Sequence, residues 1–578
     1  MKKVFFAILG IALMCSACQK GNLTEPMEQN PYRAIIEYTP STFSMNVPGA
    51  LTPVEVYDWI TVSQSGDNAT FTVRRNTTGH IRRAEFTIAG QDFICAVNQK
   101  EHGLDATISG TIKNVDLEAG IADLGFDFKS SNPDDYESWG YVLSKTNNVA
   151  DGKVTSMGKS VIGSADVQLD GIEEGGVYYV WAYIQSTEGD KLYSNLVAIF
   201  TVPVLVKDGE DLQAAINSAS PFQEVRVQGG CTFVAPKGGI MMGDGNVNKS
   251  VSGGWNADFT EQSMDNLSVL DGNKGYGFWC ANSDGSSMNG YANISYFEIK
   301  NCSGDHGTAV HCVGGPITVS NCYVHDCDSE KGAIGTNEGG HATTLNVVNC
   351  IVSNNGANAH GPAFGFGEGK SDTEPVVATL VNNLIIDNVS TKKDGYASTF
   401  IAYNQTRLIL VNNTVVGNKN WAEYGGPYSG MVLRGDIASC FVNNIMVGNF
   451  TSPCTKEMEA PEYERQNEFL NMGGGAGTLA NNLYEGAIRE SGNITIKDQI
   501  NAELGFDIST VLTADYKPLG KALGAGTLGT ISYNSKKAEM GGPFTLDVKA
   551  LLEQYKVDLA GNPRITNGKV DLGCYQAQ

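Results

Sequence analysis

The sequence predicts an all-β protein in which two N-terminal β-sandwich domains are followed by a right-handed parallel β-helix. The chain has 578 residues, too many for one hydrophobic core, so several domains are expected. Its 68 glycines and its low share of charged residues, 18%, favour strands and turns over helical bundles. The larger C-terminal part also repeats a short apolar pattern that ends in Asn or Cys, which is typical of a solenoid.

Residues 1–17 are expected to be an export signal. Two lysines precede an apolar stretch, residues 4–14, that is too short to span a membrane as a stable helix. The small residues before Cys18 resemble a bacterial lipobox, with Cys15 in place of the usual Leu. The resemblance implies a lipid on Cys18, a membrane anchor, and an outer-membrane location facing the periplasm or the cell surface. An ordinary secretory signal is the alternative, and residues 18–30 predict a polar tether.

Residues 31–103 show short alternating strands separated by turn residues, which predict a small antiparallel sandwich. The segment resembles the BACON domain in its runs Trp59-Ile-Thr-Val, Phe71-Thr-Val, Arg82-Arg83-Ala84 and Val97-Asn98-Gln99. The resemblance implies carbohydrate binding, although a spacer role fits the residues equally well. Trp59 leads directly into strand residues and is expected in the core.

Residues 104–203 alternate like the strands of a second sandwich. The run Tyr-Tyr-Val-Trp-Ala-Tyr at residues 178–183 resembles the penultimate strand of a fibronectin type III-like domain. We expect no chemistry in this segment, which would act as a spacer.

Residues 204–578 carry the strongest signal. An amphipathic helix is predicted at residues 209–219, where Leu212 and Ile216 share one face, and such a helix commonly covers the first coil of a parallel β-helix. Similar apolar segments then recur at a spacing expected of solenoid coils. The aligned segments are 294–302, 319–327, 347–355, 380–388, 410–418 and 441–449.

Stacked coils would place equivalent residues about 4.8 Å apart, in columns. One predicted column, in a turn, is Asn321, Asn349, Asn382, Asn412 and Asn443; the second is Cys302, Cys327, Asn355, Asn388, Asn418 and Asn449. Amide side chains can bond to the coils above and below, and Asn tolerates a left-handed turn. We therefore predict a structural role for these columns. The cysteines form no C-x-x-C pair in the folded part, so neither a zinc site nor a disulfide framework is indicated.

The C-terminal stretch resembles the ending of secreted right-handed β-helix proteins of the choice-of-anchor Q type. The resemblance rests on Asp558-Leu-Ala-Gly-Asn-Pro-Arg564 followed by Val570-Asp-Leu-Gly-Cys-Tyr575, and Cys574 and Gln576 depart from the usual pattern. It implies the fold and leaves the activity open, because β-helices host lyases, hydrolases, esterases and adhesins.

A variable polar loop is predicted after each member of the second column, and stacking would align these loops along one edge. The catalytic candidates among them are Lys331, His360, Lys393, His306 and Glu330; the substrate-binding candidates are Trp421, Tyr424, Arg434, Asp305, Asp328 and Asp394. Such an edge would be a lengthwise groove of mixed charge with aromatic rings, suited to an extended polysaccharide. Any single one of these side chains is more often a solvated turn residue.

Two enzyme classes fit this arrangement. A polysaccharide lyase needs a cation beside a uronate carboxylate and a base for the C5 proton, which lysine, arginine, histidine or a bound calcium ion would supply. A glycoside hydrolase needs two carboxyl groups, for which Asp305, Asp328, Glu330 and Asp394 are available. Neither family's signature is present, and we favour the lyase over the hydrolase. The alternative is a non-catalytic glycan-binding or adhesin-type surface protein.

The formal net charge of −23 argues against nucleic acid as a partner. The same field would repel an acidic polysaccharide unless Lys and Arg were gathered locally. Calcium is the one cofactor that the carboxylates suggest, and we expect a monomer.

Overall fold

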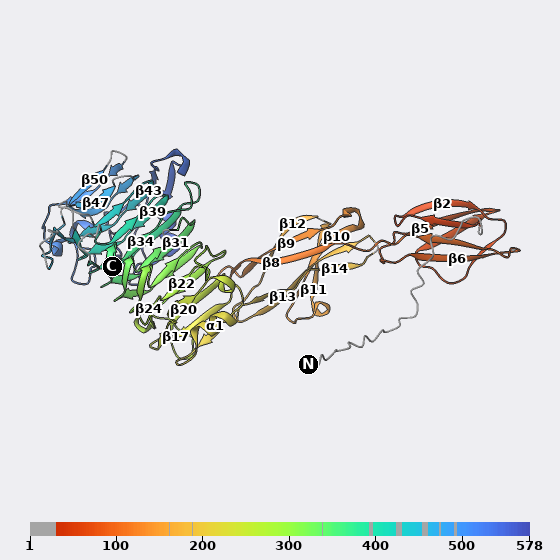
Figure 1. Ribbon diagram of the computed structural model, residues 1–578, viewed down its shortest axis with the longest axis horizontal. Coiled ribbons are helices and arrows are strands. Elements are labelled where there is room, and N and C mark those ends of the chain that lie inside the picture. The colour runs from red at the N-terminus through yellow and green to blue at the C-terminus, as the bar shows by residue number, and fades with distance from the viewer. Residues whose placement is uncertain are drawn as a thin grey trace, which may run out of the picture. The chain divides into compact units, whose positions relative to one another are not determined.

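The computed structural model describes residues 31–160, 162–187, 189–337, 339–391, 397–422, 430–453, 460–466, 468–472, 475–490 and 494–577. The chain forms two compact units, Met1–Ile199 and Phe200–Gln578 (Figure 1). The predicted all-β class is confirmed, because the described residues form strands in both units and only two short α-helices. No helix in these stretches has the length and apolar character needed to cross a membrane.

The first part of the N-terminal unit is a sandwich of two sheets, with strand orders β1-β7-β6-β3 and β2-β5-β4. The strands are β1 (Arg33–Ile36), β2 (Ser41–Asn46), β3 (Leu51–Pro53), β4 (Ile60–Ser65), β5 (Asn68–Val73), β6 (Arg82–Ile88) and β7 (Ile94–Gln99). Trp59 lies in the core with Phe71 and Phe86, as expected. Val56 is 98% exposed, because the chain leaves β3 and turns to pack Tyr57 against the core.

The second part is another sandwich, with orders β11-β10-β13-β14 and β12-β9-β8; β15 also pairs with β13. Its strands are β8 (Thr107–Asp116), β9 (Ile121–Lys129), β10 (Tyr136–Ser144), β11 (Lys153–Lys159), β12 (Gly163–Asp170), β13 (Val177–Ser186), β14 (Lys191–Tyr193) and β15 (Val197–Phe200). The aromatic run at 178–183 lies in β13, whose Tyr178 and Val180 reach the core.

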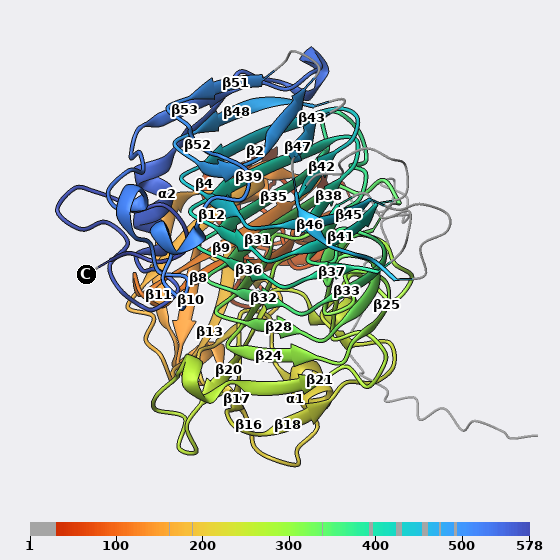
Figure 2. The ribbon, with the colours of Figure 1, turned by 90° about the vertical axis from the view of Figure 1, so that its left-hand side faces the viewer.

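The C-terminal unit is the predicted right-handed parallel β-helix. Each coil from β23 to β42 contributes one strand to each of four sheets, which we number I to IV in their order along such a coil (Figure 2). Sheet I contains β16 (Val204–Val206), β17 (Glu224–Gln228), β20 (Lys249–Trp255), β23 (Ala292–Ser295), β27 (Ile317–Ser320), β31 (Thr343–Val348), β35 (Val376–Val381), β39 (Thr406–Val411), β43 (Ile437–Val442), β48 (Ala476–Ala480) and β51 (Ile494–Lys497).

Sheet II contains β18 (Thr232–Val234), β21 (Ser268–Asp271), β24 (Phe297–Lys300), β28 (Tyr323–His325), β32 (Ile351–Ser353), β36 (Leu384–Ile386), β40 (Thr414–Val416), β44 (Ile445–Val447), β49 (Leu483–Glu485) and β52 (Ile500–Ala502). Sheet III contains β25 (Ser303–His306), β29 (Asp328–Lys331), β33 (Gly356–His360), β37 (Val389–Ser390), β41 (Lys419–Ala422), β45 (Phe450–Pro453) and β46 (Glu464–Arg465). Sheet IV contains β19 (Ile240–Met241), β22 (Phe278–Cys280), β26 (Val310–Cys312), β30 (Ile334–Thr336), β34 (Phe364–Phe366), β38 (Phe400–Ala402), β42 (Met431–Leu433), β47 (Glu468–Met472) and β50 (Ala487–Glu490).

The first coil is covered by α1 (Leu212–Ser218), the predicted helix. Asp211 caps it by accepting a hydrogen bond from the Ala214 amide, and Leu212 and Ile216 are buried in the solenoid core. Lys249 is also buried here and donates from Nζ to the Ile216 carbonyl at 2.6 Å. The helix therefore closes one end of the stack.

The first asparagine column adopts the predicted left-handed turn, with φ between 51° and 60° at all five positions. The predicted amide ladder of this column is made at one step, where Asn443 donates from Nδ2 to Asn412 Oδ1 at 3.3 Å, but the continuous ladder lies one residue further along the chain. The buried ladder is formed by Asn383, Asn413, Asn444 and Asn482, each joined to the next by a side-chain hydrogen bond of 2.9 to 3.0 Å. The second column does form the predicted ladder, from Asn355 through Asn388 and Asn418 to Asn449.

The amides of Asn382, Asn412 and Asn443 in the first column hold the C-terminal tail, which includes β53 (Thr530–Tyr533), β54 (Phe544–Asp547) and α2 (Val548–Tyr555). Asn412 donates from Nδ2 to the Asp571 carbonyl at 2.7 Å, and Asn443 donates to the Thr527 carbonyl at 2.9 Å. The fully buried Arg564 donates to the Asp571 and Gly573 carbonyls. Thus the stretch 558–575 fastens the tail over the turns between sheets I and II, away from sheet III (Figure 2).

Candidate functional site

The variable segments that the sequence placed in loops are short strands, and together they build sheet III. They pair in parallel from β25 through β29, β33, β37 and β41 to β45. Ser329, Ser390 and Asn420 of these strands are buried although polar, so no apolar alternation marked the strands in the sequence.

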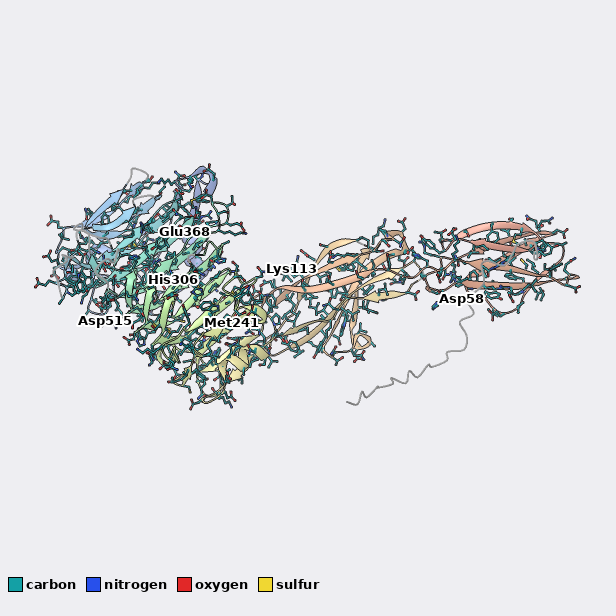
Figure 3. The ribbon with its side chains drawn as sticks, in the orientation of Figure 1. Asp58, Lys113, Met241, His306, Glu368 and Asp515 are labelled. Atoms are coloured by element: carbon teal, nitrogen blue, oxygen red, sulfur yellow. The ribbon has the colours of Figure 1, made fainter. Side chains whose placement is uncertain are left out.

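Three of the catalytic candidates are neighbours in this sheet. His306 pairs with Lys331, and Lys331 pairs with His360. Because paired strands lie about 4.8 Å apart, the three side chains follow one another along the stack. Figure 3 labels His306 on the solenoid.

The carboxylates belong to the other face of sheet III. Successive residues of a strand point to opposite faces, so Asp305 and Glu330 project away from the face that carries His306 and Lys331. Asp305 and Asp328 are exposed. The structure therefore divides the mixed-charge groove of the sequence analysis into a basic face and an acidic one.

The basic row continues onto the end of sheet IV through Tyr403, which the sequence analysis did not single out. Lys331 Nζ lies 5.1 Å from the centroid of the Tyr403 ring, and the guanidinium carbon of Arg434 lies 6.0 Å from the same centroid. Tyr403 and Arg434 directly follow the paired strands β38 and β42. We call His306, Lys331, His360, Tyr403 and Arg434 the basic–aromatic surface.

Glycines let the side chain of Lys331 lie across sheet IV. Gly335 and Gly365 pair in β30 and β34. A Cβ on Gly365 would meet the Lys331 carbonyl oxygen at 2.7 Å and the Lys331 Cβ at 3.1 Å. Turn glycines at 307, 332 and 361, with φ of 56° to 72°, connect sheets III and IV. The two sheets consequently meet at a tight corner beneath the surface.

His311 of β26 lies beside this row and is 4% exposed. Its Nδ1 lies 2.9 Å from the backbone oxygen of His306, so Nδ1 carries the proton and Nε2 is an acceptor. Burial lowers the pKa of His311 to about 4, which keeps the ring neutral near pH 7. This hydrogen bond from His311 fixes the backbone of His306, a candidate base.

A carboxylate lies just beyond the C-terminal end of a sheet IV strand. Glu368, which follows β34, accepts a hydrogen bond from Asn404 Nδ2 at 2.9 Å (Figure 3). Asn404 in turn accepts from the Asp436 amide at 3.1 Å. These contacts fix the turns that carry Tyr403 and Arg434. The partners are more than thirty residues apart in the chain, so the contacts could not be predicted from the sequence.

The remaining predicted site residues are elsewhere or outside the described residues. Trp421 lies in sheet III and pairs with Ser452. The register of the sheet gives Trp421 the same position in β41 that Glu330 has in β29, so Trp421 belongs to the acidic face. Lys393, Asp394 and Tyr424 lie outside the described residues. In the part of the chain that is described, no group of three or more His, Cys, Asp or Glu is placed to hold a metal ion.

No family model and no curated protein matches the chain. Among solved structures, pectate lyase PelI from Erwinia chrysanthemi is 10% identical and aligns over 69% of this chain and 90% of its own, with a TM-score of 0.14. Another structure of PelI is a complex with tetragalacturonic acid, with a TM-score of 0.14. A tandem of titin domains I9–I11 is 9% identical over 31% of this chain and 69% of its own, with a TM-score of 0.18. Similarities with TM-scores this low do not establish a shared fold, so the fold assignment rests on the strand pairing of the chain itself.

Proposed function

We propose that the chain binds an extended acidic polysaccharide on its basic–aromatic surface. The observation that carries the proposal is the convergence of Lys331 and Arg434 on the ring of Tyr403, in a protein of net charge −23. Two cations beside one aromatic ring offer an anionic sugar both charge attraction and a flat apolar surface. The row of equivalent positions along the stack favours a ligand that is itself extended.

The test is affinity electrophoresis of the purified chain in gels that contain polygalacturonate, alginate or neutral hydroxyethylcellulose, with calcium or with a chelator. We expect retardation by at least one acidic polymer and release by salt, because the contacts are electrostatic. Equal migration in the acidic and neutral gels would overturn the proposal. The calcium arm tests the cofactor.

Cleavage by β-elimination is the second candidate function. His306 and His360 flank Lys331 on one face of sheet III, which supplies candidates for a base and for the cation that offsets a uronate carboxylate. Loss of the C5 proton and departure of the C4 oxygen would leave an unsaturated product. Asp305 and Glu330 are neighbours on the opposite face of sheet III, so a hydrolase would have to act on that acidic face and not on this row. Ultraviolet-absorbing products, absent for His306→Ala or His360→Ala, would distinguish a lyase from a binding protein.

We further propose that Cys18 carries a lipid that anchors the chain to a bacterial outer membrane. The BACON-like and fibronectin type III-like sandwiches would then act as spacers, and the chain would work as a monomer. Metabolic labelling with a fatty-acid analogue tests the anchor: Cys18→Ala should lose the label and leave the membrane fraction, whereas Cys15→Ala should keep both. A labelled Cys18→Ala protein would contradict the assignment.

A further inference from the structure

We propose that Tyr276, Trp279 and His311 form an aromatic subsite that binds the carbon–hydrogen face of a neutral sugar ring. This inference rests on the proposed function, because it extends the same polysaccharide path toward the first coils of the solenoid. It also deepens that function, since the ligand would then carry neutral as well as acidic sugars.

The three rings form one rigid group. The rings of Trp279 and His311 are stacked, with centroids 4.1 Å apart and an angle of 15° between their planes. Tyr276 stands edge-on to both, at centroid distances of 4.9 Å and 5.9 Å. The indole nitrogen of Trp279 donates to the Asn282 carbonyl at 3.1 Å, and the Tyr276 hydroxyl accepts from the Asp305 amide at 3.2 Å. Both large rings are therefore held in place before any ligand arrives.

The group lies on the same side of sheet IV as the basic–aromatic surface. Trp279 pairs with His311, and His311 pairs with Gly335, so the rings lead strand by strand to the glycines under Lys331. Trp279 and Gly335 are two strand spacings apart, about 10 Å. His311 also holds the His306 backbone, which links the rings to the first member of the basic row.

Two observations favour a ligand over a purely structural role. Tyr276 and Trp279 keep part of their surface exposed, whereas the core aromatic Phe278 between them is fully buried. His311 Nε2 is a buried acceptor with no hydrogen-bond partner among the described residues, which is costly in a folded protein. Aromatic faces with one nearby polar atom suit a sugar ring, whose face is apolar and whose rim carries hydroxyl donors.

The experiment uses the full mature chain labelled with 5-fluorotryptophan and followed by ¹⁹F NMR. The chain has six tryptophans, and Trp279→Phe assigns the Trp279 signal. Trp255 is the matched control, because it is also half-buried in the solenoid but lies in sheet I under the guanidinium of Arg226, 4.2 Å away. The probes are cellohexaose, mannohexaose and xylohexaose as neutral oligosaccharides, and hexagalacturonate as the acidic one.

We expect at least one neutral hexasaccharide at millimolar concentration to shift the Trp279 signal while the Trp255 signal stays in place. Tyr276→Ala should weaken this binding about tenfold, and Trp255→Phe should leave it unchanged. If no neutral probe moves the Trp279 signal, or if Trp255 responds equally, the subsite is refuted. A response to a neutral probe by a chain that neither polygalacturonate nor alginate retards would retain the subsite and refute the acidic-ligand proposal, so the two failures are distinguishable.

Discussion

Lys331 and Tyr403 belong to coils that are two turns of the solenoid apart, yet the Lys331 ammonium lies 5.1 Å from the centroid of the Tyr403 ring. The lysine side chain covers this distance by lying along sheet IV, where Gly365 offers no side chain to block it. The contact joins sheet III to the far end of sheet IV and positions a positive charge on the solenoid.

Replacing Lys331 with Met should remove the charge while keeping the length of the side chain. We expect binding of the acidic polymer to fall roughly tenfold, which corresponds to about 1.4 kcal/mol. Lys419→Met is the matched control, because Lys419 also lies in sheet III but contacts Tyr463, with Nζ 5.6 Å from that ring. Isothermal titration calorimetry checks both variants, and an equal loss for the two would show that the position of the charge is irrelevant.

Gly365→Ala should disturb the surface without touching any charge. The new methyl group would meet the Lys331 backbone oxygen at 2.7 Å, so the corner between sheets III and IV must shift. We expect a loss of about 1–3 kcal/mol in the free energy of unfolding, together with weaker ligand binding. Gly238→Ala is the control, because a Cβ at Gly238 meets nothing within 4 Å. Urea unfolding measures both, and unchanged stability of Gly365→Ala would contradict the close approach.

The sequence predicted the coils well because their physics is local and repetitive. Apolar residues at matching positions must bury against neighbouring coils, and the Asn of each turn must tolerate positive φ, as Asn349 and Asn412 do. In the doublets Asn382-Asn383 and Asn412-Asn413, the sequence does not distinguish the amide that points inward from the one in the turn. Cys350, which aligns with Asn383, indicates the answer, because a small apolar residue in that column marks the buried position.

The candidate site was predictable only in part. The register of the coils brought His306, Lys331 and His360 together, since each follows a recognisable repeat. The face on which each side chain lies was not predictable, because strands this short and polar carry no apolar alternation. Tyr403 was missed because it lies outside the aligned segments and its contacts are made by a long lysine across two coils.

Stability should fall in mild acid because of His311. Its folded-state pKa of about 4 lies below the usual value of 6.5, so the unfolded chain binds the proton more readily. A group whose pKa is lowered in this way destabilises the fold as the pH drops from 6.5 toward 4. At pH 4.5 the loss should be roughly 2–3 kcal/mol relative to pH 7. His311→Gln should flatten this part of the pH profile, while the exposed His80→Gln should not. Identical profiles for wild type and His311→Gln would refute the assignment.

The buried amide ladder should be intolerant of charge. Asn413 donates from Nδ2 to the Leu380 carbonyl at 2.9 Å and to Asn444 Oδ1 at 3.0 Å, and its own Oδ1 accepts from the Asn383 amide at 3.0 Å. Asn413→Asp keeps the shape but places a carboxylate against two acceptors in a fully buried position. We expect a loss of more than about 3 kcal/mol at pH 7.

Burial would raise the pKa of this new carboxyl group, and its protonation restores one donor, so the defect of Asn413→Asp should shrink as the pH falls from 7 to 5. Asn501→Asp is the matched control, because Asn501 lies in β52 at the exposed end of sheet II. Urea unfolding at the two pH values, with the wild type beside each variant, separates this effect from that of His311. A defect of Asn413→Asp that is small at pH 7, or that grows on acidification relative to the wild type, would mean that the amide ladder does not hold adjacent coils in register.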